Sequence, residues 1–196
     1  MRVPISWLKD YIDIDIPLEE LTRKLTMAGI EVSSIETIGE SWSSIFISEV
    51  IDLAPHPNAD RLKLATVSFG KEPVSVVCGA PNISRGQRVA FAMTGANLID
   101  PDTRKPTQLK PARIRGVLSE GMICSELELG IGENHLGIMI LPEDAPIGTQ
   151  LSDYLGDKVL DLEITSNRPD CLSVLGIAHE IAALTGGSVK ESVIEY

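Results

Sequence analysis

The sequence predicts a two-part fold, in which an α+β domain made from both ends of the chain is interrupted by an inserted all-β module. The middle of the chain carries several short alternating segments and no long helical pattern. Each end carries one strand-like and one helix-like segment, and an arm of roughly 40 residues is too short to bury a core alone. We therefore expect residues 1–39 and 151–196 to form one discontinuous domain around a module of residues 40–150.

The first arm is expected to form a helix and then a strand. Pro17 suits the first turn of a helix. Apolar residues then recur at the spacing of one buried helix face: Leu18, Leu21, Leu25 and Ala28. Gly29 is a natural end for this helix. Residues 30–38 are rich in β-branched side chains and predict a strand, and residues 39–44 are typical of a linker.

The second arm is expected to reverse that order. Residues 159–165 alternate as a strand, and residues 167–170 form a turn in which Asp170 is expected to cap the next helix. Helical spacing then relates four apolar residues: Val174, Ile177, Ile181 and Leu184. Gly186 and Gly187 predict the end of that helix.

The middle is expected to form a small barrel or sandwich. Apolar residues alternate over residues 45–53, with an interruption at Glu49, and again over residues 61–69, where the apolar phase shifts after Leu64. A bulge or a barrel bend would explain that shift. Further strands are expected in four segments separated by turn signals, namely residues 74–78, 89–93, 112–117 and 137–141.

Composition and charge restrict the class of protein. Apolar residues make up 43% and charged residues 23%, which is typical of a globular protein and excludes a disordered tail, a collagen and a coiled coil. No apolar stretch approaches the ~20 residues of a membrane span. The start turns acidic by Asp10, so a secretory signal is not expected. Three widely separated cysteines without a C-x-x-C motif favour the cytoplasm.

The net charge of −11 argues against a nucleic-acid partner, but its distribution does not. Residues 56–121 hold ten basic and five acidic residues, a net charge of +5, which leaves −16 for the rest of the chain. Within a strand, Arg61 and Lys63 should share a face, as should Arg113 and Arg115. Such a face would attract phosphates by releasing counterions, although a merely solvated strand face is the alternative. Only eight aromatic residues are present, so backbone and shape contacts should dominate over base stacking.

The sequence lends less support to an enzyme active site or a metal site. A nucleophilic hydrolase built on Cys124 would need a nearby base, and the spacing of His56 and His135 selects no triad. The apolar neighbours of Cys124 favour a buried structural thiol instead. The three histidines are too scattered for a metal site. We therefore predict no catalytic residue and no metal ligand.

Four segments resemble the tRNA-binding module that occurs alone or attached to several aminoacyl-tRNA ligases. They are H-P-N-A-D-R-L (56–62), V-V-C-G-A-P-N (76–82), K-P-A-R-I-R-G-V (110–117) and S-E-G-M-I-C-S (119–125), in the order of the family. That family folds as an OB barrel. The resemblance therefore implies an α+β arm domain interrupted by an inserted all-β OB-fold barrel.

Segments outside the barrel resemble the bacterial phenylalanine–tRNA ligase β subunit. These are M-R-V-P-I-S-W-L-K-D-Y-I at the start, S-E-L-E-L-G (125–130) and T-S-N-R-P-D-C-L (165–172). The family's β subunit is several times longer, so we expect a non-catalytic N-terminal fragment without a cofactor of its own. The resemblance implies ATP and magnesium for the whole enzyme. It implies as partners tRNA, the remainder of the β subunit and a catalytic α subunit in an α2β2 assembly.

We expect the RNA contacts to come from basic residues of the barrel. They are Arg61, Lys63, Lys110, Arg113 and Arg115, with Arg85 and Arg88 as secondary candidates. The family motif residues His56, Pro57, Asn58 and Asp60 are expected to shape a turn rather than to touch RNA. Asn167, Arg168 and Asp170 are expected to lock the arm domain or its contact with further domains. The alternative is a module that assembles ligase subunits without RNA contact. Clustering of the basic residues on one face would favour RNA.

Overall fold

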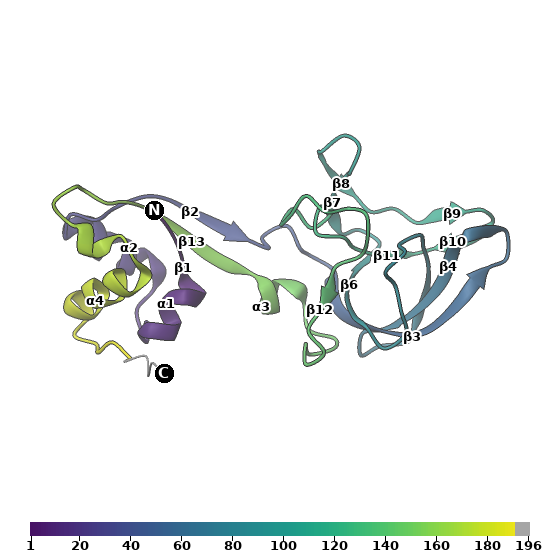
Figure 1. Cartoon of the computed structure of the whole chain (residues 1–196), viewed down its shortest axis with the longest axis horizontal. Coiled ribbons are helices and arrows are strands. Elements are labelled where there is room, and N and C mark those ends of the chain that lie inside the picture. Colours follow the sequence, from purple (N-terminus) through teal and green to yellow (C-terminus); the bar gives the residue numbers. More distant parts are fainter. Residues whose placement is uncertain (191–196) are drawn as a thin grey trace. The chain divides into compact units, whose positions relative to one another are not determined.

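A computed structural model describes residues 1–190, and the chain divides into two compact units (Figure 1). The first unit comprises Met1–Ile38 together with Asp157–Tyr196, and the second comprises Gly39–Gly156. Among the described residues, no helix is long and apolar enough to cross a membrane.

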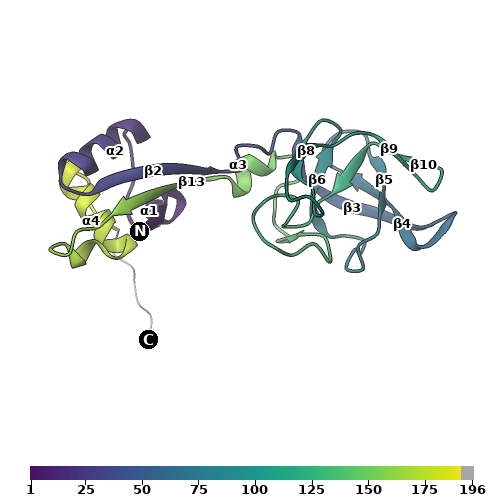
Figure 2. The ribbon, with the colours of Figure 1, turned by 90° about the horizontal axis from the view of Figure 1, so that it is seen from above.

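The first unit packs helices on a three-stranded antiparallel sheet with the order β1-β13-β2. Its elements are β1 (Arg2–Pro4), α1 (Ile5–Tyr11), α2 (Leu18–Met27), β2 (Glu31–Ile38), β13 (Asp157–Glu163), the 3-10 helix η1 (Pro169–Cys171) and α4 (Val174–Thr185). β13 lies between two strands from the start of the chain, and Figure 2 shows it running beside β2. One core joins Leu8, Leu21 and Leu25 to Leu160 and Ile177.

The helices and strands expected in the two arms are confirmed. α2 follows Pro17, buries Leu21 and Leu25, and ends before Gly29, whose φ of +91° is in the left-handed region that glycine tolerates best. α4 ends at Gly186, which is also left-handed. The predicted strands correspond to β2 and β13.

Two details of this unit differ from the sequence prediction. Asp170 does not cap α4, because it lies inside η1; the cap is Ser173, whose Oγ accepts a hydrogen bond from Gly176 N at 3.0 Å. The elements β1 and α1 had no prediction, since α1 has only two turns and no side chain caps its first turn.

The second unit is a nearly closed antiparallel barrel with the strand order β11-β6-β3-β4-β5, and it is consistent with an OB-like barrel. Its elements are β3 (Ile45–His56), β4 (Ala59–Ser68), β5 (Val74–Cys78), β6 (Arg88–Met93), β7 (Asn97–Ile99), β8 (Pro106–Gln108), β9 (Ala112–Ile114), β10 (Val117–Ser119), β11 (Gly121–Ile123), β12 (Ile140–Leu141) and α3 (Leu151–Leu155). Two hairpins, β7–β8 and β9–β10, form separate two-stranded sheets. The barrel core contains Val50, Val67, Phe69 and Phe91.

The S-E-G segment (residues 119–121) closes the barrel where β11 approaches β5. Ser119 Oγ accepts a hydrogen bond from Val77 N at 3.2 Å and donates one to Gly121 O at 2.9 Å. A Cβ on Gly121 would lie 2.5 Å from the Phe91 ring, so only glycine allows β11 to pair with β6 here.

The predicted barrel strands correspond to β3, β4, β5 and β6, and three other features of the barrel differ from the prediction. β4 pairs with β5 without a break from Lys63 to Val67, so no bulge lies where its apolar phase shifts; the bulge lies in β3, between Val50 and Asp52. The segment 39–44 is not a free linker, because Trp42 is buried and its Nε1 donates a hydrogen bond to Leu129 O at 2.9 Å.

The segment expected as one strand over residues 112–117 is the hairpin β9–β10 instead. Its two-residue turn consists of Arg115 and Gly116, with φ of 49° and 94°. Two successive left-handed residues are typical of the tight hairpin turn that matches the twist of the strands. Arg113 and Arg115 therefore do not share one strand face, since Arg113 lies in β9 and Arg115 stands at the hairpin tip.

Candidate nucleic-acid interface

Hydrogen bonds from His56 and Asn58 join the β3–β4 hairpin to the tip of the β9–β10 hairpin. His56 Nε2 donates to Ile114 O at 3.2 Å, and Asn58 Nδ2 donates to Arg115 O at 3.0 Å. The backbone N–H of Asn58 donates to His56 Nδ1 at 3.1 Å. This network assigns the ring proton to Nε2, because Nδ1 must be the acceptor. We call these two residues and their three hydrogen bonds the hairpin clamp.

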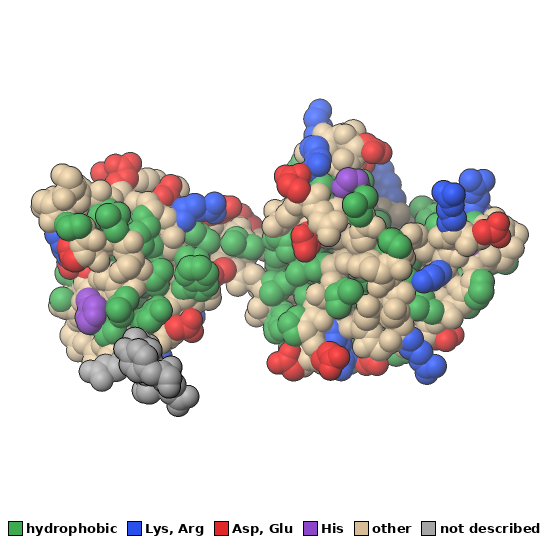
Figure 3. Space-filling model, in the orientation of Figure 1, with side chains coloured by type: hydrophobic (Ala, Val, Ile, Leu, Met, Phe, Trp, Pro, Cys, Tyr) green, Lys and Arg blue, Asp and Glu red, His purple; other side chains and the backbone are tan. Residues whose placement is uncertain are grey.

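The hairpin clamp brings three exposed arginines into one region of the barrel. Arg61 lies in β4 directly after the clamped turn, whereas Arg113 and Arg115 belong to the clamped hairpin. Within residues 1–190, the side chains of Arg61 and Arg115 make no hydrogen bond or ion pair, and Arg113 donates one long hydrogen bond to Gly116 O at 3.4 Å. In Figure 3, basic side chains stand at the end of the barrel where Figure 1 labels β4, β9 and β10.

The other expected RNA contacts divide into available and occupied side chains. Lys63 is half-buried, and its Nζ donates to Ile83 O at 3.3 Å, beside the loop that carries the exposed Arg85. Lys110 is exposed two residues before the start of β9. Arg88 is different, because its Nη1 lies 2.8 Å from Glu49 Oε2 and that carboxylate neutralises its charge.

The exposed side chain of a second motif asparagine, Asn82, also holds two segments of the barrel together. The Asn82 Oδ1 accepts from Ile138 N, and the Nδ2 donates to Ile138 O, both at 2.9 Å. A Cβ on Gly137 would lie 2.6 Å from Asn82 Oδ1, so the two segments meet closely. The polar motif residues thus build the barrel, and the basic residues between them remain exposed.

The thiols of Cys78 and Cys124 are buried in the barrel. Cys124 is fully buried, as the sequence predicted, and its Sγ lies 3.8 Å from Met122 O. Burial raises the pKa of Cys124 and also that of Cys78. His56 is occupied by the hairpin clamp. Over the described residues, no group of three or more His, Cys, Asp or Glu side chains has an arrangement that could hold a metal ion.

In the first unit, Arg168 ties η1 to α4. Its Nη2 lies 2.9 Å from Asp170 Oδ2 and 2.7 Å from Glu180 Oε2. The hydrogen-bonded guanidinium lowers the pKa of Asp170 to about 2. A Cβ on Gly176 would lie 1.8 Å from Asp170 O, so this contact also requires glycine. Arg168 and Asp170 therefore lock the fold internally, whereas the exposed Asn167 makes no side-chain hydrogen bond to a described residue.

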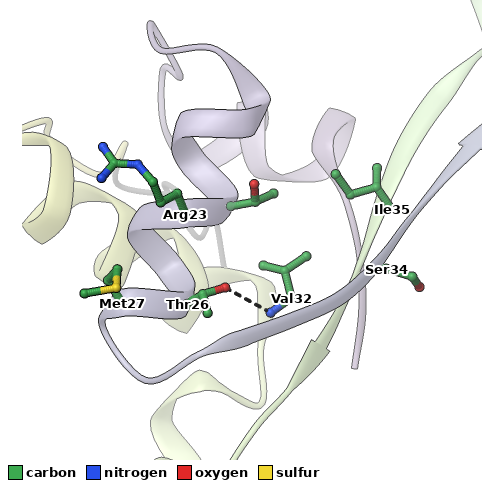
Figure 4. A pocket seen from close by; sticks show the side chains of 7 residues that line it. Arg23, Thr26, Met27, Val32, Ser34 and Ile35 are labelled. Carbon is green, nitrogen blue, oxygen red and sulfur yellow. Dashed lines mark hydrogen bonds between the residues drawn. The ribbon is translucent and has the colours of Figure 1, made fainter.

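A shallow groove between α2 and β2 lacks the side chains of a catalytic site. Figure 4 shows Arg23, Thr26 and Met27 on the helix opposite Val32 and Ile35 on the strand. Its lining carries a single ionisable side chain, that of Arg23, so it has no acid–base pair for catalysis.

Comparison with known proteins shows the family of the barrel. Residues 45–150 match the model of the family described as "Putative tRNA binding domain". The chain belongs to this family. It is 49% identical to the "Phenylalanine--tRNA ligase beta subunit" of Syntrophus aciditrophicus over 97% of its own length and 23% of that protein. Identity to the subunit of the same description in Dehalococcoides mccartyi is 47%, with 94% and 23% covered.

The chain thus spans about a quarter of the length of these curated relatives. Among solved structures, a "MetRS related protein from Pyrococcus horikoshii" is 21% identical, with a TM-score of 0.38 over 55% of this chain and 87% of that one. That score is too low to add to the assignment. The match to the tRNA-binding family covers all three arginines that the hairpin clamp brings together.

Proposed function

We propose that this chain is a non-catalytic, tRNA-binding part of a phenylalanine–tRNA ligase β subunit. The observation that carries the proposal is the region of exposed Arg61, Arg113 and Arg115 around the hairpin clamp. Arginines with free guanidinium groups bind phosphate oxygens in pairs of parallel hydrogen bonds. Lys63, Lys110 and Arg85 would extend the contact. Arg88 would not take part, because Glu49 already neutralises it.

Recognition would depend on the phosphate backbone and the shape of the RNA. The phenylalanines of the barrel pack on one another, with ring centroids of Phe69 5.6 Å from Phe46 and 5.4 Å from Phe91. Lys71 Nζ covers the Phe46 ring at 5.7 Å. These rings are not free to stack on bases, which favours contacts without base readout.

The same proposal extends to the whole protein. The parent enzyme would attach phenylalanine to its tRNA with ATP and magnesium in the cytoplasm, using a catalytic α subunit in an α2β2 assembly. Residues 1–39 and 151–196 would form a discontinuous α+β domain around an inserted OB fold of residues 40–150. The pairing of β13 with both β1 and β2 supports that arrangement.

A second candidate function, subunit assembly without RNA contact, is favoured by one observation on the first unit. Trp7 and Leu172 are 59% and 63% exposed, and Trp7 lines a shallow hollow with Leu175. Exposed apolar groups of this kind mark protein-contact surfaces. The first unit also carries 7 basic and 14 acidic residues, a net charge of −7, which discourages RNA contact with it.

The test is the affinity of the 196-residue chain for labelled tRNAPhe across a salt series. The variant Arg113→Glu/Arg115→Glu should bind more weakly and with a flatter dependence of log affinity on log salt, by roughly two phosphate contacts. Arg104→Glu is the matched control, since Arg104 also lies at a hairpin tip but pairs with Glu133 at 2.6 Å. An absence of binding at low salt would reject the RNA role and favour assembly.

A further inference from the structure

We infer that His56 and Asn58 are positioning residues for RNA binding, which hold the β9–β10 hairpin so that Arg113 and Arg115 meet phosphates in one fixed arrangement. The inference rests on the proposed function. It goes beyond the expectation that these motif residues shape their own turn, because their side chains bind a different hairpin, 57 and 58 residues away in sequence.

The β9–β10 hairpin is a structure that needs external support. It pairs only three residues on each strand and is not part of the main barrel sheet. A two-stranded hairpin of this size is marginally stable by itself in water. Its residues are exposed or half-buried apart from Ser119, which fixes only the base of the second strand. The hairpin clamp supplies the support at the opposite end, where the two arginines are.

The clamp acts on the backbone that carries the arginines. Its acceptors are the carbonyls of Ile114 and Arg115, two consecutive residues between Arg113 and the turn glycine. Arg115 has φ of 49°, a conformation that is uncommon for a residue with a Cβ. The two hydrogen bonds hold that backbone without occupying either guanidinium group. Both charges therefore remain free for phosphate.

The two clamp residues depend on each other. His56 is 95% buried, and its Nδ1 accepts the hydrogen bond that orients the backbone of Asn58. Loss of the His56 ring therefore removes one hydrogen bond to the hairpin directly and weakens the second through Asn58. Glutamine at position 56 retains an N–H donor, so it should retain more binding than alanine.

A double-mutant cycle separates positioning from general stabilisation of the barrel. The affinity for labelled tRNAPhe is measured for Asn58→Ala, for Arg113→Ala/Arg115→Ala, and for all three changes together, at a temperature where circular dichroism shows each variant folded. Asn58→Ala should lower the affinity roughly three- to tenfold, the usual worth of one hydrogen bond. It should cause no further loss once both arginines are absent. Asn97→Ala is the matched control, since the exposed Asn97 makes no side-chain hydrogen bond to a described residue.

The outcomes distinguish the inference from the function on which it rests. If Arg113→Ala/Arg115→Ala leaves the affinity unchanged, the proposed function fails. If that variant binds weakly but Asn58→Ala binds normally, or if the effect of Asn58→Ala persists without the arginines, the positioning role is overturned. Should Asn58→Ala unfold, His56→Gln and His56→Ala carry the same cycle. An equal loss in these two variants would contradict the dependence on the N–H donor.

Discussion

Replacement of Arg115 by asparagine should change stability and RNA affinity in opposite directions. Arg115 is the first of two left-handed residues in the β9–β10 turn, with φ of 49°. The left-handed conformation costs an ordinary residue about 1–2 kcal/mol, and asparagine is among the residues that adopt it most readily. Arg115→Asn should therefore stabilise the barrel by about 0.5–1 kcal/mol. For a unit of roughly this size, that gain raises Tm by roughly 2–4 °C.

The same change should weaken tRNA binding, because it removes one phosphate contact. The slope of log affinity against log salt should fall by about one. Differential scanning calorimetry measures the first effect, and a salt titration with labelled tRNA measures the second. Arg104→Asn is the matched control, since Arg104 has φ of 56° but pairs with Glu133. Its affinity for tRNA should not change. A variant Arg115→Asn that is less stable and binds normally would refute the reasoning.

Three further predictions concern the fold. Gly121→Ala should destabilise the barrel by about 1–3 kcal/mol in denaturant titrations, because the new Cβ would overlap the Phe91 ring; an unchanged midpoint would contradict this packing. Cys124 should react with a thiol reagent only as fast as the native chain opens, since it is fully buried and its pKa is raised; rapid labelling would instead restore the hydrolase hypothesis. Arg168→Gln should lower thermal stability at neutral pH, and its difference from the parent chain should shrink as pH falls from about 4 toward 2. Arg168 lowers the pKa of Asp170, so the ion pair stabilises the fold fully above about pH 4 and loses its contribution as the pH falls toward 2. A difference in thermal stability that grows in acid would contradict the ion pair.

The elements that sequence periodicity predicted well are those whose contacts are local. α2 and α4 each show one apolar face at helical spacing, and each is followed within two residues by a left-handed glycine, Gly29 or Gly186. β5 was predicted without error, because a short segment with three valines lies between two turn signals. The β9–β10 hairpin was missed since A-R-I-R-G-V alternates like a strand, and only Gly116 signals the turn within it.

The parts that sequence could not predict depend on distant contacts. Trp42 is buried through a partner 87 residues away, so its segment had the appearance of a linker. Sequence alone could not distinguish Arg88 from Arg85 as an RNA-binding candidate, because only the pairing of β3 with β6 places Arg88 against Glu49. The hairpin clamp likewise joins residues 57 and 58 positions apart, and no local pattern records it.

The most direct test of the RNA interface is the hydrogen-exchange footprint of tRNAPhe on the chain. Amides of residues 56–61 and 112–118 should become protected when tRNA is added, and those of the β7–β8 hairpin, residues 97–108, should not. Added salt should remove the protection along with the binding. Protection confined to the first unit, or spread away from both clamped hairpins, would contradict the account.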